Sequence, residues 1–268
     1  MYKLLALDLD GTLTNSKKEI TPHTLDVLLR AQRQELRIVL ASGRPVAGIA
    51  PLAEQLRLKE YGGFIMAFNG GVIIDCATQD TIYECLLDTG VYRHLYEKGN
   101  TEDFRILSYV EGHIACEDIE NEYVKYEAML NRMPLMKLDN FLDTITYPEP
   151  KCLIVGKPEK LEVLEKELAS YYDGKINVYR SEPFFLEIVP LGIDKAKRLE
   201  FLVSHLDIKK DNLMACGDGF NDLSMIKYAG LGVAMSNAQQ VVKDAADYVT
   251  LSNEEDGVAA AVERFILK

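Results

Sequence analysis

This 268-residue chain lacks the features that mark several classes of protein. It has no basic excess: 30 Lys and Arg stand against 42 Asp and Glu, which gives a formal net charge of -12. Binding along nucleic acid or to an anionic membrane surface needs a basic face, so the composition argues against both. No uninterrupted apolar run approaches the roughly 20 residues that span a bilayer. We therefore predict no nucleic-acid partner and no membrane partner.

Cysteine and histidine are few and scattered. The five cysteines show no CxxC spacing, and the four histidines show no HxH or HExxH pattern. Neither a zinc site nor a disulfide framework is indicated. The first apolar run is interrupted by Asp8 and is too short for the core of a signal peptide. These features favour a cytoplasmic protein with reduced thiols.

The order of apolar runs predicts an α/β fold with a parallel sheet. Strand-like runs at 2–8 and 37–41 alternate with helical spacing at 21–35 and 45–58, and residues 63–74 follow as a strand, a turn at 69–71 and a second strand. Strand and helix patterns alternate again in the last third of the chain. Such alternation is typical of a sheet whose strands are joined by helices that cover its faces.

The middle of the chain has a different pattern of residue types. Its strand-like runs mix apolar, polar and aromatic residues, as in FRILSYV at 104–110 and FFLEIV at 184–189. We predict a discontinuous core domain made of residues 1–80 and 190–268, with a separate α+β cap domain inserted at 81–189.

The most informative segment is DLDGTLTN, at residues 8–15, directly after an apolar run. Asp8 and Asp10 lie two residues apart, and the chain must turn at Gly11. Both carboxylates can therefore converge at the mouth of a sheet, where acids and free amides suit a cation and a phosphate together. An Asp-Gly turn that closes a hairpin is the structural alternative.

We predict that four segments follow the carboxyl ends of apolar strands, and in an open parallel sheet such loops form one crevice. They are residues 8–15, 41–44 (ASGR), the region of Lys195, and 217–222 (GDGFND). The acids they bring together are Asp8, Asp10, Asp218 and Asp222. These carboxylates would repel one another unless a hard cation took the charge, and an all-oxygen ligand set selects magnesium.

Donors for a phosphoryl group come from the same segments. Ser42 offers a hydroxyl, the turn at Gly43 offers amides, and Lys195 offers a cation near a helix start. Each part has a structural alternative when taken alone. Ser42 would be a strand-end hydroxyl, Arg44 and Lys195 surface charges, Asn69 part of a turn, and GDGFND a turn with a helix cap. Their combination, in this order, favours phosphoryl transfer.

The motifs DxDGTxT, SGRP, a lysine after an apolar strand, and GDGxND resemble the haloacid dehalogenase (HAD) superfamily phosphatases of the Cof type, which carry the subfamily IIB cap. FNG at 68–70, LEIVP at 186–190 and GVAMSNA at 232–238 resemble the same branch. The resemblance implies a Rossmann-like parallel-sheet core with an inserted α+β cap.

The resemblance also implies roles for individual residues. Asp8 would be the nucleophile that forms an aspartyl-phosphate, and Asp10 would protonate the leaving oxygen and then activate water. The phosphoryl group would be held by Leu9, Gly11, Thr12, Ser42, Gly43, Lys195 and Asn221, with Asn221 orienting the phosphate or the lysine. Mg²⁺ would be bound by Asp8, the carbonyl of Asp10 and Asp218, with Asp222 either as a further ligand or as a residue that supports the ligands.

One departure from the family pattern concerns the lysine, which is usually followed by glycine but here by Ala196. Lys195 and Lys197 would lie on different helix faces, so only one can reach the site, and we choose Lys195 by its distance from LEIVP.

The predicted function is a Mg²⁺-dependent phosphatase that hydrolyses a small-molecule phosphate ester, in particular a sugar phosphate. Substrate contacts are predicted at Arg44, Asn69, Arg180 and Glu187. Two alternatives stay open: a phosphosugar mutase of the phosphomannomutase type, and a non-catalytic sensor of a phosphorylated metabolite.

Overall fold

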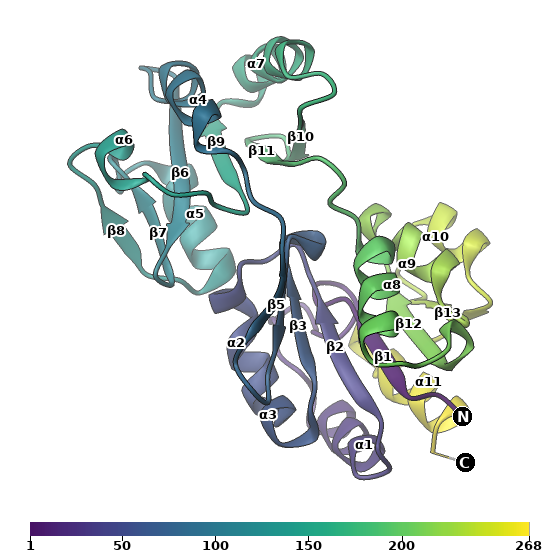
Figure 1. The fold of residues 1–268 in the computed structure, drawn as a ribbon. Coiled ribbons are helices and arrows are strands. Elements are labelled where there is room, and N and C mark those ends of the chain that lie inside the picture. The colour runs from purple at the N-terminus through teal and green to yellow at the C-terminus, as the bar shows by residue number, and fades with distance from the viewer. Residues whose placement is uncertain (268) are drawn as a thin grey trace. The chain divides into compact units, whose positions relative to one another are not determined.

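The computed structural model describes residues 1–267 and divides the chain into two compact units (Figure 1). The core unit comprises Met1–Tyr83 and the chain from Asp194 onward, and the inserted unit comprises Glu84–Ile193. The borders predicted from the sequence lie three and four residues away, respectively. The α/β fold class with a parallel-sheet core is confirmed.

The core unit is built on an eight-stranded sheet with the order β14-β13-β12-β1-β2-β3-β4-β5. Pairing is parallel from β14 to β3, and β4 runs antiparallel to β3. The strands are β1 (Leu4–Leu7), β2 (Arg37–Ala41), β3 (Phe64–Ala67), β4 (Val72–Asp75), β5 (Thr81–Glu84), β12 (Leu213–Gly217), β13 (Leu231–Ala234) and β14 (Tyr248–Val249).

The central strands of this sheet are buried on both faces. All residues of β1, β12 and β13 are buried, as continuous apolar runs in a helix-covered parallel sheet should be. The helices of this unit are α1 (Pro22–Gln32), α2 (Val46–Gln55), α3 (Leu58–Tyr61), α8 (Lys195–His205), α9 (Leu223–Tyr228), α10 (Gln240–Ala245) and α11 (Gly257–Phe265).

The strand order creates a switch point at β1. The chain leaves β1 for β2 on one side, and β12 flanks β1 on the other. At such a point the loops beyond the carboxyl ends of the strands diverge and leave a crevice. The loops that follow β1, β2 and β12 therefore meet at one place.

The inserted unit has its own six-stranded sheet, ordered β10-β11-β9-β6-β7-β8 and largely antiparallel. An apolar core that includes Leu95, Ile106, Phe141 and Ile154 packs its helices on the sheet. The elements are α4 (Tyr92–Gly99), β6 (Phe104–Val110), β7 (His113–Cys116), α5 (Glu122–Asn131), β8 (Leu135–Lys137), α6 (Phe141–Thr144), β9 (Cys152–Gly156), α7 (Pro158–Tyr171), β10 (Ile176–Glu182) and β11 (Phe185–Pro190).

One sequence-based expectation needs correction. We expected Lys195 to follow a strand of the core sheet, but the apolar run before it is β11, which pairs with β9 and β10 in the inserted unit. Lys195 is instead the first residue of α8. The pairing of a strand depends on distant partners, so a local apolar run does not reveal which sheet it joins.

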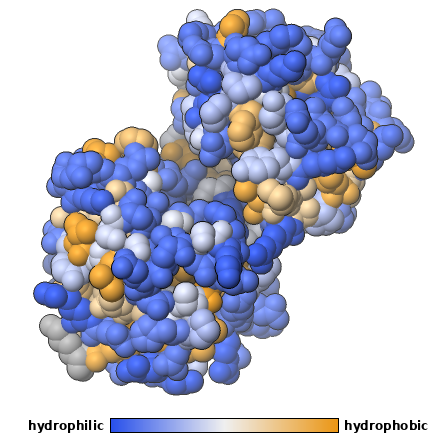
Figure 2. Space-filling model, turned by 180° about the vertical axis from the view of Figure 1, so that it is seen from behind, coloured by the Kyte–Doolittle hydropathy of each residue, from blue (hydrophilic) through white to orange (hydrophobic). Residues whose placement is uncertain are grey.

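Exposed large apolar side chains come from several separate segments of the described chain, for example Met129, Val163 and Phe220. Figure 2 shows one face of the molecule as mainly hydrophilic, with small scattered apolar areas, as is normal for a protein surface. Within residues 1–267, no helix combines the length and the apolar character needed to cross a bilayer.

Candidate active site

The centre of the candidate site is a buried lysine between two carboxylates. Asp8 directly follows β1 and is 5% exposed, and Lys195 at the start of α8 is 1% exposed. The Lys195 Nζ donates to Asp8 Oδ1 at 2.7 Å and to Asp222 Oδ1 at 2.6 Å. Lys197, by contrast, is exposed. The lysine chosen from the sequence is thus the one beside Asp8.

Asp222 holds the loop after β12 in place through hydrogen bonds. Its Oδ2 accepts hydrogen bonds from the backbone amides of Asp218 at 3.0 Å and Gly219 at 2.9 Å, while its Oδ1 holds Lys195. Both oxygens of Asp222 are therefore engaged. This arrangement favours Asp222 as the residue that positions Lys195 and Asp218, rather than as a direct ligand of a cation.

The carboxylates nevertheless form a cluster that fits a divalent cation. Asp8, Asp218 and Asp222 each offer an oxygen, and these oxygens lie within 4.8 Å of one another. Asp218 Oδ1 accepts from the Thr12 hydroxyl at 2.8 Å, and its Oδ2 faces Gly11. Hard oxygen ligands in this number suit Mg²⁺, which keeps waters and needs few carboxylates.

The electrostatics of the cluster also fit a cation. Burial, followed by the neighbouring carboxylate of Asp222, raises the pKa of Asp8 to about 8, although Lys195 opposes the shift. Burial likewise raises the pKa of Asp218 to about 6. For Lys195, burial would lower the pKa, but Asp222 and Asp8 outweigh it and raise the pKa. Without a further positive charge, this cluster favours bound protons, and a divalent cation would replace them.

Asp10 lies in a second, more exposed cluster of charged side chains. Arg44 donates from Nε to Asp10 Oδ2 at 2.8 Å and from Nη2 to Oδ1 at 2.6 Å, and Lys18 Nζ donates to Oδ1 at 2.6 Å. Burial would raise the pKa of Asp10, but the hydrogen bonds and charges of Arg44 and Lys18 outweigh it and lower the pKa. Arg44, which we predicted as a substrate contact, is thus engaged by Asp10.

The segment after β2 supplies Ser42, which is 2% exposed. Its Oγ accepts from the amide of Arg44 at 3.2 Å, and its carbonyl accepts from the amide of Asn69 at 2.8 Å. The Asn69 side chain lies against Gly43 and accepts from Asn221 Nδ2 at 3.2 Å. The structure thus brings Ser42, Gly43, Asn69 and Asn221 together, with Asn221 bonded to Asn69 rather than to Lys195.

The turn after Asp8 is tightly bonded. The carbonyl of Leu9 accepts from the amides of Thr12 at 3.3 Å and Thr14 at 2.9 Å. The Thr12 hydroxyl holds Asp218, so Thr12 joins the first loop to the loop after β12. Gly11 has φ +83°, a left-handed conformation that glycine adopts readily.

Two predicted substrate residues lie in the inserted unit, each paired within it. Arg180 donates from Nε to Glu165 Oε2 of α7 at 2.7 Å. Glu187 accepts from Lys151 Nζ at 3.0 Å and from the Ser181 hydroxyl at 2.8 Å. Their contact with a substrate remains a prediction.

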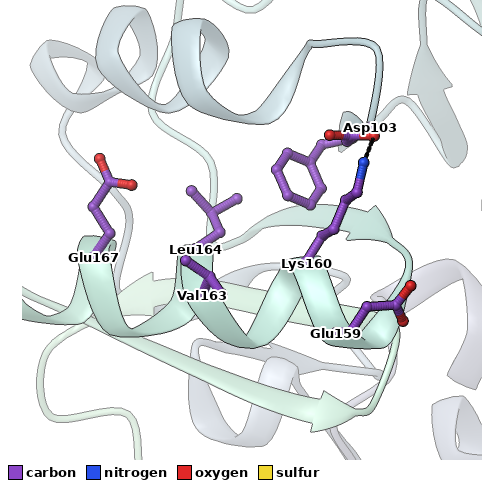
Figure 3. Close-up of a pocket in the computed structure, with 7 residues that line it drawn as sticks. Asp103, Glu159, Lys160, Val163, Leu164 and Glu167 are labelled. Carbon is purple, nitrogen blue, oxygen red and sulfur yellow. Dashed lines mark hydrogen bonds and ion pairs between the residues drawn. The ribbon is translucent and has the colours of Figure 1, made fainter.

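The inserted unit also has a shallow groove of about 380 Å³ between α7 and the start of β6 (Figure 3). Lys160 reaches from α7 to Asp103, and Glu167 is paired with Lys98. None of the predicted site residues lines this groove. It contributes no group to the chemistry outlined above.

Sequence reasoning missed two residues that contact the first loop. Lys18 binds Asp10, and Asn237 Nδ2 donates to the carbonyl of Gly11 at 2.8 Å. Asn237 lies inside the GVAMSNA segment, which carried the family resemblance but received no role. Lys18 stands in a charged turn with no pattern that would single it out.

Comparison with known proteins agrees with this geometry. A family model described as haloacid dehalogenase-like hydrolase matches residues 5–262. A Bacillus subtilis (strain 168) protein named "Putative phosphatase YxeH" is 33% identical over 270 residues, covering 100% of this chain and 99% of its own length. The family resemblance seen in the motifs is therefore confirmed.

Solved structures give the same result. A haloacid dehalogenase-like hydrolase from Bacteroides thetaiotaomicron is 53% identical, with a TM-score of 0.97 over 98% of this chain and 99% of that one. A structure described as a HAD subclass IIB sugar phosphatase is 27% identical, with a TM-score of 0.81 and 98% coverage of both chains.

Proposed function

Since this chain belongs to the haloacid dehalogenase-like hydrolase family, we propose that it is a Mg²⁺-dependent phosphatase of small phosphorylated metabolites. The observation that carries the proposal is the buried Asp8–Lys195–Asp222 arrangement beside Asp218. This arrangement supports the proposal because Asp8 would serve as the nucleophile, Lys195 would bind phosphoryl oxygens, and the neighbouring carboxylates would offer ligands for a divalent ion.

The reaction proceeds in two steps on Asp8. An oxygen of Asp8 attacks phosphorus, the bond between phosphorus and the ester oxygen breaks, and Asp10 gives that oxygen its proton. Asp10 then takes a proton from water as the water oxygen attacks phosphorus, and the bond to Asp8 breaks. Lys195 and the Ser42 hydroxyl stabilise the charge on the phosphoryl oxygens.

Asp8 and Asp218 would hold Mg²⁺ together with the carbonyl of Asp10, and Asp222 would keep the loop after β12 in place. Bound Mg²⁺ supplies charge neutralisation for the phosphoryl group during transfer. Burial of the two ligand carboxylates supports this assignment, because buried carboxylates without a cation favour their protonated forms.

We propose sugar phosphates as the substrate class. The support is the similarity, along nearly the whole chain, to a structure described as a sugar phosphatase. Asn69 would contact the phosphorylated substrate from the core unit, and Arg180 and Glu187 would do so from the inserted unit after leaving their present partners. Arg44 would act near the leaving group, beside Asp10.

A reducing compartment, the cytoplasm, is the proposed location. All five cysteines are free thiols, and four of them are buried. Burial raises the pKa of the Cys216 thiol to about 12, so this thiol is unreactive as well as unpaired.

The test is phosphate release from a panel of phosphorylated metabolites, with Mg²⁺ and with EDTA. We expect release that requires Mg²⁺ and that falls at least a thousandfold in Asp8→Asn. Asp26→Asn is the matched control, because this side chain is 64% exposed and lies on α1. Full activity in Asp8→Asn would refute the assignment, and phosphoryl transfer to a second sugar without free phosphate would indicate the mutase.

A further inference from the structure

Lys18 lies in a hydrogen-bonded turn formed by residues 15–19. The Asn15 side chain accepts from the amides of Lys17 at 3.0 Å and Glu19 at 3.1 Å, and the Lys18 amide donates to the carbonyl of Asn15 at 2.9 Å. Lys18 itself has φ +60°, a left-handed conformation that lysine rarely adopts. The turn thus keeps a strained lysine whose amine reaches Asp10.

The turn is also anchored from the far end of the chain. The amide of Ser16 donates to Glu254 Oε1 at 2.6 Å, and Asn253 Nδ2 donates to the carbonyl of Thr14 at 3.0 Å. Exposed ion pairs usually contribute little, and both Lys18 and Asp10 are more than a third exposed. Here, however, the anchored backbone fixes where the lysine can reach.

The two oxygens of Asp10 are occupied unequally. Oδ1 accepts from Lys18 Nζ and from Arg44 Nη2, both at 2.6 Å, whereas Oδ2 accepts only from Arg44 Nε, at 2.8 Å, among the described residues. A carboxylate oxygen has room for about two donors. Oδ1 is therefore filled, and Oδ2 keeps one position for a further partner.

We propose that Lys18 is a positioning residue that, with Arg44, fills Asp10 Oδ1 and so leaves Oδ2 as the oxygen that exchanges the proton. The inference rests on the proposed function, in which Asp10 serves first as acid and then as base. In the first step the proton on Oδ2 passes to the ester oxygen as its bond to phosphorus breaks. In the second step Oδ2 receives a proton from the attacking water.

The experiment compares two esters in Lys18→Met. One is p-nitrophenyl phosphate, whose leaving group departs without a proton; the other is the sugar phosphate that the wild type hydrolyses fastest. Because kcat/KM covers the steps up to aspartyl-phosphate formation, it reports the proton given to the leaving group. We expect kcat/KM to fall about tenfold for the sugar phosphate and less than about twofold for the aryl ester.

Two further variants sharpen the comparison. Lys18→Arg keeps a donor for Oδ1 and should restore most of the sugar phosphate activity. Lys17→Met removes the neighbouring lysine side chain, leaves the Lys18–Asp10 contact in place, and should match the wild type on both esters.

Equal losses on both esters would overturn the proposal, because they would indicate a purely structural role for Lys18. A rise in sugar phosphate turnover would also overturn it, because it would show that Lys18 acts only through its charge. Asp8→Asn and Asp10→Asn distinguish a failure of the proposed function from a failure of the inference about Lys18. If Asp8→Asn stays active, or Asp10→Asn affects both esters alike, the proposed function fails; if both behave as proposed and Lys18→Met is silent, only this inference fails.

Discussion

Gly11→Ala tests whether the close contact between the loop after β1 and the loop after β12 requires a glycine at position 11. Gly11 has φ +83°, and a Cβ placed on it would lie 2.4 Å from Asp218 Oδ2. Ordinary contact begins at 3.4 Å, so the Asp218 carboxylate would have to move by about 1 Å. That movement strains the hydrogen bond from the Thr12 hydroxyl and displaces a proposed cation ligand.

The magnitude follows from two contributions. A left-handed alanine costs about 1 to 2 kcal/mol relative to glycine. Crowding against Asp218 adds about 1 to 3 kcal/mol, so we expect a loss of about 3 kcal/mol in the free energy of unfolding. A reactive group misplaced by about 1 Å costs on the order of a hundredfold in rate, so kcat/KM should fall by about that factor.

Gly62→Ala is the matched control for this prediction. Gly62 lies in the same unit with φ +69°, and its nearest neighbour to an added Cβ is Arg37 Nε at 3.9 Å. It therefore bears the backbone cost without the crowding, and it should keep normal activity. The assays are urea unfolding followed by circular dichroism and phosphate release. If both variants lose the same stability and Gly11→Ala keeps its activity, the proposed contact between the loops is not required.

Two further predictions concern metal and pH. Mg²⁺ at a hundred times its Kd should add about 3 kcal/mol to the free energy of unfolding of the wild type, and this gain should vanish in Asp218→Asn but persist in Asp26→Asn, as measured by urea unfolding. In the inserted unit, burial raises the pKa of Glu149 from 4.5 to about 7, so the folded state holds the extra proton and stability falls as pH rises from 4.5 to 7. Glu149→Gln should therefore gain about 1 kcal/mol at pH 8, after allowance for solvent screening, and nothing at pH 4; an equal gain at both pH values would contradict the assigned cause.

Sequence patterns correctly predicted those strands and helix ends that depend on neighbouring residues alone. The strands predicted at 37–41 and 104–110 have those same bounds, because each is a continuous run that is buried beyond its first one or two residues. Thr21 caps α1 with its side chain, and Pro22 opens the helix, as their residue types favour. By contrast, α4 (Tyr92–Gly99) was missed although Tyr92, Leu95 and Gly99 form a buried stripe at helical spacing, because a helix of eight residues repeats this pattern only once.

The candidate site shows the same division. Asp8, Asp10, Asp218 and Asp222 stand in recognisable motifs, so their residue types and order predicted an acidic cluster. Lys18 could not be found this way, because its position depends on a left-handed turn that brings the amine back to Asp10. Pairings between distant segments are set by tertiary packing and leave no periodic signal in the sequence.

Under the proposed function, the charge balance of the site would allow an acidic protein to attract a phosphate. Four carboxylates, those of Asp8, Asp10, Asp218 and Asp222, face three cations, those of Lys18, Arg44 and Lys195. With every carboxyl ionised, the site carries a net charge of -1 by this count and would repel a phosphate dianion. The proposed divalent cation would reverse the sign, and a phosphorylated substrate would then meet a locally positive site in a chain of net charge -12. Lys18 and Arg44 are necessary to this reversal, since without them even the bound cation would leave the site negative.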